Sequence, residues 1–301
     1  MSEIRRRTGP FRDAASLGSF WSDAHGIGRL GYLVGAALIA SGVIHGLILI
    51  VGGGCWEGPL SLRKPTTFGL SFGLTLLTIV WVSSFLRLGE RTRKILLGGF
   101  IAACTLETAL VTLQAWRGVP SHFNLETPFD ALIARVLAGG GMALVAIILA
   151  LTVASFRSNP AVPPSLRLAI RVGFVSLMAS LVVGALMIAK GMMLVFAGQP
   201  EAAYATGGTL KPTHAVTMHA ILVLPLLAWL LSFTDWSERR RVGAVATAAA
   251  GYATLAAAVA IANVTGVQPG QSSSPLIAIS ATGALLVLAT GVLAAVSARH
   301  G

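Results

Sequence analysis

Five ionisable side chains lie inside long apolar stretches of this sequence: His45, Glu107, Arg135, Lys190 and His219. A polar group within a membrane span costs free energy, so each one is a candidate for function. If the stretches are transmembrane helices, a rise of about 1.5 Å per residue places all five within roughly 14 Å of the outer membrane surface. We therefore expect them to line one polar chamber that opens outward.

Less specific roles are open for each of these residues. The long side chains of Arg135 and Lys190 can extend to the lipid headgroups. Glu107 can stay neutral in the core or pair with Lys190. A single histidine in a membrane helix often forms an interhelical hydrogen bond.

The histidines are the candidate ligands of a cofactor. Two neutral imidazoles at one depth, His45 and His219, suit the axial positions of a b-type haem or the coordination of a transition-metal ion. His214 lies about 140° from His219 around an ideal helix, so both cannot face one central atom. His214 is therefore a secondary candidate, as a gate or a proton-exchanging group.

The loop from Arg117 to Asn124, Arg-Gly-Val-Pro-Ser-His-Phe-Asn, is too rich in side-chain chemistry for a spacer. Arg117 offers a planar fork for a carboxylate or phosphate. His122 can act as a ligand or a proton carrier. Two further residues of the loop are secondary candidates, Ser121 and Asn124.

The elements that must position these residues are membrane helices. The chain has 301 residues, of which 55% are hydrophobic and 11% charged, with a mean hydropathy of +0.79. Soluble domains carry roughly 25% charged residues. Alternating β-barrel patterning is absent. The sequence predicts an all-α polytopic membrane bundle of about eight transmembrane helices, near 30–52, 66–86, 94–116, 129–156, 168–197, 212–233, 242–264 and 275–297.

The net charge of +11 reflects topology and not nucleic-acid binding. Basic residues cluster before the first span and in every second loop, as the positive-inside rule expects when both termini are cytoplasmic. The first 29 residues show no short apolar core before a cleavage site, which argues against a signal peptide. We expect a protein of the bacterial cytoplasmic (inner) membrane. Its segments are a cytoplasmic N-terminal segment (1–29), helices 1–4 (30–156), a cytoplasmic linker (157–167), helices 5–8 (168–297) and a cytoplasmic tail (298–301).

The tripeptide Lys-Pro-Thr occurs twice, at Lys64–Thr66 and at Lys211–Thr213, each time ahead of an apolar run. A constant offset carries the second predicted helix onto the sixth, and both end in Trp, Ser and Phe before a charged loop. One interpretation is a parallel repeat of four plus four helices. The other is ordinary helix-entry chemistry, because proline is common in the first helical turn.

Three motifs combine in this chain: a Lys-Pro-x-x-Phe helix start at Lys64–Phe68, the Arg-Gly-x-x-Ser-His-Phe-Asn loop, and His-x4-His-x4-Leu-Pro from His214 to Pro225. The combination resembles a family of uncharacterised bacterial multi-pass membrane proteins. The resemblance covers roughly half the chain and implies an architecture and a site location, but no activity. Trp116 departs from the small residue expected there. The predicted bundle is also similar to haem A synthase, whose cysteine-pair loop and four histidines are not matched here.

The first functional hypothesis is redox chemistry. His45 and His219 would bind a haem b or a metal, and the glycines around His45, Gly42 and Gly46, would make room for the macrocycle. Glu107 would carry protons, and electrons would pass to a quinone that uses His122 as its proton partner. Three cations would hold the haem propionates: Arg117, Arg135 and Lys190.

Two alternatives remain open. The chain could transport a small anion or a proton-coupled solute, with Arg135 and Lys190 binding it and Glu107 or His219 titrating. It could instead be a metal-dependent membrane lipid hydrolase that uses His45, His122 and His219. No P-loop, dinucleotide fingerprint or His-Glu-x-x-His motif appears. The candidate partners are the lipid bilayer, a quinone, a small anionic ligand and a second copy of the chain, and nucleic acid is excluded.

Overall fold

The computed structural model describes residues 21, 26–58, 60–205, 210–266 and 274–299, so most of the expected N-terminal segment (1–29) and the last two residues of the tail lie outside the described residues. Helices dominate, and no strand occurs in the described part of the chain. The long helices are α3 (Ile27–Val51), α4 (Arg63–Ser83), α5 (Glu90–Trp116), α6 (Pro128–Ser155), α7 (Pro164–Phe196), α9 (Lys211–Leu231), α10 (Glu238–Val264) and α11 (Ser274–Arg299), with a short α8 (Pro200–Ala205) between α7 and α9.

Eight helices of the described chain are long and apolar enough to cross a membrane. This confirms the predicted all-α bundle of eight spans, and the expected helix ends differ from the observed ones by at most four residues, as at 242 against 238 for α10. Several ends follow from simple capping chemistry. The Thr127 side chain accepts a hydrogen bond from the backbone N–H of Asp130, and Pro128 occupies the first turn of α6.

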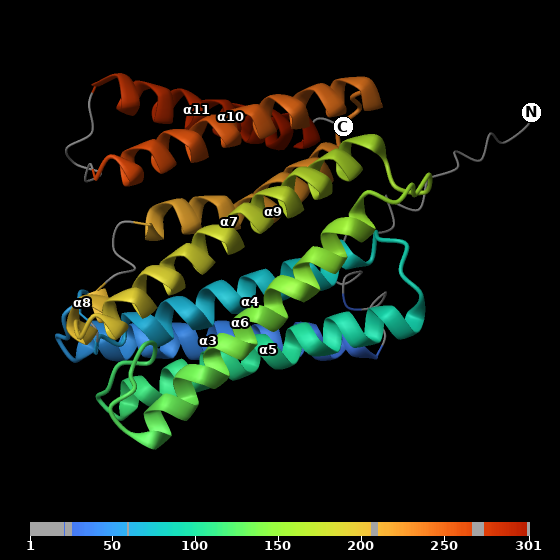
Figure 1. The fold of residues 1–301 in the computed structure, drawn as a ribbon. Coiled ribbons are helices and arrows are strands. Elements are labelled where there is room, and N and C mark those ends of the chain that lie inside the picture. The colour runs from blue at the N-terminus through green and yellow to red at the C-terminus, as the bar shows by residue number, and fades with distance from the viewer. Residues whose placement is uncertain (1–20, 22–25, 59, 206–209, 267–273, 300–301) are drawn as a thin grey trace, which may run out of the picture.

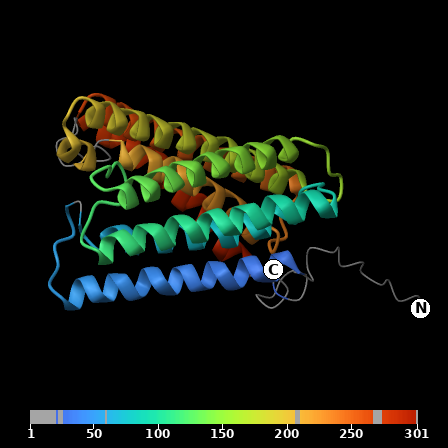
Figure 2. The same cartoon turned by 60° about the horizontal axis from the view of Figure 1, so that its bottom comes forward.

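The helices run side by side in two groups (Figure 1). One group contains α3, α4, α5 and α6, and the other contains α7, α9, α10 and α11. Corresponding pairs pack in the same order in both groups: α3 on α4 and α7 on α9, then α5 on α6 and α10 on α11. The groups meet where α4 contacts α9 and where α6 continues into α7 (Figure 2).

The closest helix contact joins α3 to α4 through glycines. A Cβ atom at Gly69 would lie 2.6 Å from the backbone nitrogen of Gly42, and one at Gly73 would lie 2.7 Å from the carbonyl oxygen of Gly35. Only the absence of side chains lets these two backbones approach so closely. The glycine face beside His45 is thus filled by α4 and does not make room for a flat ligand.

A second feature repeated between the groups is the turn that follows α4 and α9. The pattern Trp-x2-Ser-Phe-x4-Glu-Arg-x-Arg begins at Trp81 and again at Trp229, 148 residues later. The first and fifth side chains form edge-to-face ring pairs in both copies, Trp81 with Phe85 and Trp229 with Phe233, with ring centroids 5.6 and 4.9 Å apart.

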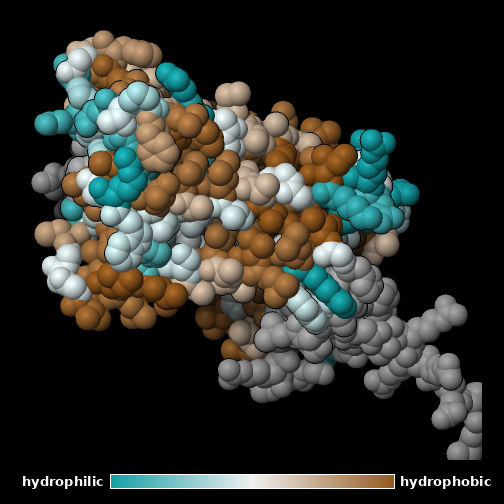
Figure 3. Space-filling model, turned by 90° about the horizontal axis from the view of Figure 1, so that it is seen from below, coloured by the Kyte–Doolittle hydropathy of each residue, from teal (hydrophilic) through white to brown (hydrophobic). Residues whose placement is uncertain are grey.

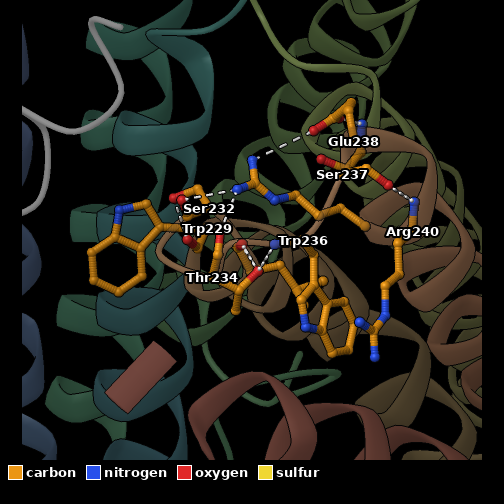
Figure 4. A network of polar contacts seen from close by, with 10 residues as sticks. Trp229, Ser232, Thr234, Trp236, Ser237, Glu238 and Arg240 are labelled. Carbon is orange, nitrogen blue, oxygen red and sulfur yellow. Dashed lines mark hydrogen bonds and ion pairs between the residues drawn. The ribbon is translucent and has the colours of Figure 1, made fainter. Parts of the chain in front are cut away.

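The last arginine of each copy has the same role. The guanidinium of Arg93 donates to the carbonyl oxygens of Ser83 and Leu86, and that of Arg241 donates to those of Ser232 and Thr234. Each arginine thereby satisfies carbonyl groups that the end of a helix leaves without partners. Figure 4 shows the second copy, in which Arg240 also lies over the ring of Trp236 at 3.7 Å from its centroid. The shared sequence, turn geometry and helix pairing support the four-plus-four repeat.

The surface separates into an apolar middle and two polar ends (Figure 3). Large apolar side chains are exposed along the helices, among them Ile50 at 75% and Leu285 at 64%. Such a surface is stable in lipid and not in water, so the chain is an integral membrane protein. We call the end with the loops 84–89, 156–163 and 232–237 the basic end, because it holds Arg87, Arg157 and Arg239–Arg241. The end with the segments 52–58, 60–62, 117–127 and 197–205 is the opposite end.

Candidate functional site

Arg117 closes the loop at the opposite end. Its guanidinium donates to the carboxylate of Asp130 over 2.6 Å and also to the side-chain oxygen of Gln114. The same carboxylate accepts hydrogen bonds from the side chains of Gln114, at 2.9 Å, and Thr127, at 2.7 Å. Because Asp130 is only 2% exposed, this buried network fixes α5 to α6. Arg117 is therefore engaged within the protein and does not offer a free fork to a ligand.

The rest of the loop folds inward between α4 and α7. Ser121 and Asn124 are buried, and the Phe123 ring fills the space above Gly191, where a Cβ atom would collide with it. Phe123 adopts a φ of 65°, which is uncommon for a residue other than glycine. The side-chain oxygen of Asn124 accepts from the backbone N–H of Glu126, while its amide nitrogen has no partner among the described residues.

His122 lies between this loop and the start of α4. Its Nδ1 is 3.0 Å from the Ser121 hydroxyl, and its ring centroid is 5.9 Å from that of Phe68. Burial and the nearby Lys64 ammonium lower the pKa of His122 to about 4. The imidazole is consequently neutral near pH 7 and can accept or donate one hydrogen bond through Nε2.

The two Lys-Pro-Thr motifs begin α4 and α9 at this same end. Lys64 and Lys211 lie near enough for their charges to repel each other, and Arg63 adds a third positive charge. Arg63 is paired with Glu57 at 3.2 Å. In the described part of the chain, no carboxylate lies within ion-pair distance of Lys64 or Lys211. We call Lys64, Lys211 and His122 the junction cluster.

His45 already has partners for both ring nitrogens. Its Nδ1 donates to the carbonyl oxygen of Ser41 over 2.7 Å, and its Nε2 accepts from the indole N–H of Trp116 over 3.0 Å. This bond ties α3 to α5. The arrangement is the interhelical hydrogen bond that was the less specific interpretation of this histidine.

The histidines of α9 are engaged in its own half of the bundle. The Nδ1 of His219 lies 2.5 Å from the carbonyl oxygen of Ala215 one turn earlier. The Nδ1 of His214 lies 2.8 Å from the carbonyl oxygen of Ser180 on α7. α3 packs on α4 and α5, while α9 packs mainly on α7 and α10, and no direct contact between α3 and α9 stands among the main helix contacts of the described chain.

The remaining expected site residues separate into exposed and buried ones. Arg135 and Lys190 are exposed, which suits cations that extend toward headgroups. Glu107 is buried at 4% exposure, and one of its carboxyl oxygens has no hydrogen-bond partner among the described residues.

The arrangement does not fit the proposed haem or metal site. Binding through His45 Nε2 would require its bond to Trp116 to break, and the glycine face beside it is filled by α4. Within the described residues, no three His, Cys, Asp or Glu side chains are grouped so that they could hold a metal ion.

Sequence reasoning missed the importance of three residues. Lys64 and Lys211 were interpreted as helix-entry signals or as a sign of a repeat, but not as residues of a binding site. Trp116 was noticed only as a departure from a family pattern, and its position gave no sign of its bond to His45. Comparison of the chain with protein-family models, with curated proteins and with solved structures finds no match.

Proposed function

We propose that this protein binds a small anion at the junction cluster and carries it across the bacterial cytoplasmic membrane. The observation that carries the proposal is the pair Lys64 and Lys211, whose ammonium groups come from the two Lys-Pro-Thr motifs and repel each other. No carboxylate of the described chain lies within ion-pair distance of either, although Glu57, which is paired with Arg63, also attracts Lys211. Like charges near each other cost free energy, which a bound anion would recover.

Helix geometry supports the same ligand. Both α4 and α9 begin at this point, so the positive ends of their dipoles lie near the lysines. The first-turn backbone N–H groups of Arg63, Lys64 and Thr213 already have partners within the protein. His122 adds a neutral hydrogen-bonding group to the cluster. The anionic ligand of the proposal is thus held by the lysines, and not by Arg135 and Lys190 as the sequence suggested.

The repeat supports transport over static binding. Transporters built from repeated halves hold their substrates between those halves, which rock against each other around the site. Here the junction cluster takes one lysine from each half. Basic residues at the other end of the molecule support an outer position for the junction cluster, by the positive-inside rule.

Binding is tested first, with purified protein in detergent and acetate, nitrate, sulfate or phosphate as the probe anions. A bound anion raises the unfolding temperature in a concentration-dependent manner, because it binds the folded state alone. We expect Lys64→Gln and Lys211→Gln each to weaken binding by about tenfold or more, since a charge-assisted hydrogen bond contributes about 1.5–3 kcal/mol. The matched control is Lys190→Gln, which removes an exposed lysine and should leave binding unchanged.

Transport is then measured as uptake of the best-bound anion by proteoliposomes. Uptake should follow the affinity ranking of the variants. Equal binding by wild type, Lys64→Gln and Lys211→Gln would refute the junction cluster as the site. A haem band in the reduced-minus-oxidised spectrum of the same preparation would instead support the redox hypothesis, and stoichiometric zinc would support the lipid hydrolase.

A further inference from the structure

Glu107 is a second polar centre, separate from the junction cluster. It lies on α5, nine residues before the end of the helix at Trp116, or about 13 Å along the helix axis. The side chain is 4% exposed, and Oε1 has no hydrogen-bond partner among the described residues. None of the ion pairs in the described chain includes this carboxyl group.

On the neighbouring helix α6, Gly140 leaves space for the Glu107 carboxyl group. A Cβ atom added to Gly140 would lie 2.5 Å from Glu107 Oε1 and 3.4 Å from its carboxyl carbon. The carboxyl group thus occupies the volume that any other residue at position 140 would fill. The adjacent glycines differ, because a Cβ atom at Gly139 or Gly141 would meet nothing within 4 Å.

No fixed positive charge faces Glu107 from the packed helices. On α5 itself the nearest titratable group is the buried thiol of Cys104, and on α4 no ionisable residue occurs between Lys64 and Arg87. On α6 none occurs between Arg135 and Arg157, and on α3 the only imidazole, His45, is bonded to Trp116. A carboxylate buried without a cation is costly, so the protonated acid is the form this site favours at neutral pH.

Two threonines lie between Glu107 and the opposite end of α5, at about 100° (Thr108) and about 140° (Thr112) around an ideal helix from Glu107. Thr108 and Thr112 each bury a hydroxyl group without a partner among the described residues. This differs from Thr105, whose hydroxyl donates to the carbonyl oxygen of Ile101 in the manner usual for helical threonines. One turn after Thr112 comes Trp116, with its bond to His45.

We propose that Glu107 is an internal proton-binding site, whose carboxylate takes up one proton, and that water at the Thr108 and Thr112 hydroxyls connects it around α5 toward the opposite end. Buried polar groups in proteins almost always have partners, and water is the usual partner where the protein supplies none. The proton comes from solvent at the opposite end, so no other reactant is needed. The site lies within the pair α5 and α6, which run side by side in Figures 1 and 2.

The proton bound at Glu107 would also be the ion that is coupled to anion transport. Only this coupling rests on the proposed function. An anion held at the junction cluster and a proton held at Glu107 would cross together with little net charge. The proton site itself is independent of the anion and can be tested without it.

The test uses dicyclohexylcarbodiimide, an apolar reagent that converts protonated carboxyl groups in membrane interiors to stable N-acylureas. The carboxylic acid adds to the carbodiimide carbon, its proton passes to nitrogen, and the acyl group then migrates from oxygen to nitrogen. We expect peptide mass spectrometry of the full-length protein to find the adduct on Glu107 and not on Glu126, a carboxyl group in an exposed loop. The yield should fall as pH rises, because only the acid reacts.

Infrared difference spectra provide the second measurement. The carbonyl band of a protonated carboxylic acid should be present in wild type and absent in Glu107→Gln, which keeps the shape of the side chain. In D₂O the band should shift quickly in wild type and more slowly in the double variant Thr108→Val and Thr112→Val, which removes both hydroxyls at nearly constant volume.

Each outcome decides the proposal. An adduct on Glu107 with a pH-dependent yield, together with slowed exchange in the double variant, supports it. An unlabelled Glu107, or a carbonyl band that survives in Glu107→Gln, overturns the proton site. Rapid exchange in the double variant overturns the threonine path. If Glu107 is labelled as expected but proteoliposomes take up no anion, only the function proposed for the junction cluster is refuted.

Discussion

Replacing Gly69 by alanine should separate α3 from α4. A Cβ atom at this position would lie 2.6 Å from the backbone nitrogen of Gly42 and 2.7 Å from the carbonyl oxygen of Leu38. Both are backbone atoms of α3, so neither can rotate away as a side chain could. Normal contact requires about 3.5–4.0 Å between such atoms, which means that the helices must move apart by about 1 Å.

The energetic cost follows from that displacement. Overpacking a close contact costs about 1–3 kcal/mol, and a gap of up to 1 Å loses about a quarter to a half of the dispersion energy of the atoms along the seam. Alanine recovers about 1 kcal/mol through its higher helix propensity. We therefore expect Gly69→Ala to lower the free energy of unfolding by about 1–3 kcal/mol overall.

The assay is thermal unfolding of purified variants in one detergent, followed by helical circular dichroism. The matched control is Gly139→Ala, also in a helix interior, where an added Cβ atom meets nothing within 4 Å. The control should be neutral or stabilising by about 0.5–1 kcal/mol. If Gly69→Ala raised the unfolding temperature as the control does, the close backbone contact between α3 and α4 would be refuted.

Three further predictions concern the opposite end. Asp130→Asn leaves the Arg117 guanidinium without its anion and should cost about 2–4 kcal/mol of stability, measured by the same thermal unfolding; an unchanged unfolding temperature would contradict the network. Trp116→Phe removes the donor to His45 Nε2 and should destabilise the protein by about 1 kcal/mol, and combined with His45→Ala the two losses should be less than additive. The low pKa of His122, about 4 against about 6.5 when unfolded, means that the unfolded chain binds this proton more tightly. Stability should therefore fall as pH decreases from about 6.5 to about 4, by at most about 3 kcal/mol, and His122→Asn should abolish that part of the pH dependence.

The depths of the polar residues could be estimated from the sequence, but their directions could not. A helix rises by a constant amount per residue, so counting places Glu107 and Lys190 at comparable levels. The side that each residue faces depends on how its helix is rotated against its neighbours. Lys190 proved exposed and Glu107 buried, which counting along the chain could not distinguish.

The candidate site moved from the two histidines to the junction cluster for a related reason. His45 and His219 were selected as ligands because they share a depth, yet His45 is bonded to Trp116 of α5 and His219 contacts a carbonyl group of its own helix. The junction cluster takes one lysine from each of two helices that begin 148 residues apart. The repeated tripeptide identified both lysines, but only the contact between α4 and α9 brings their charges together.

By itself, the sequence determined which segments are helices able to span a membrane and which loops share the basic end. These are local properties, since about twenty apolar residues must form a helix in lipid to satisfy their own backbone groups. The tertiary structure alone decided that Trp116 donates to His45, 71 residues away, and that Gly140 makes the space for the Glu107 carboxyl group. Such contacts depend on the rotation and separation of packed helices, which are set by all of their side chains together and not by any single motif.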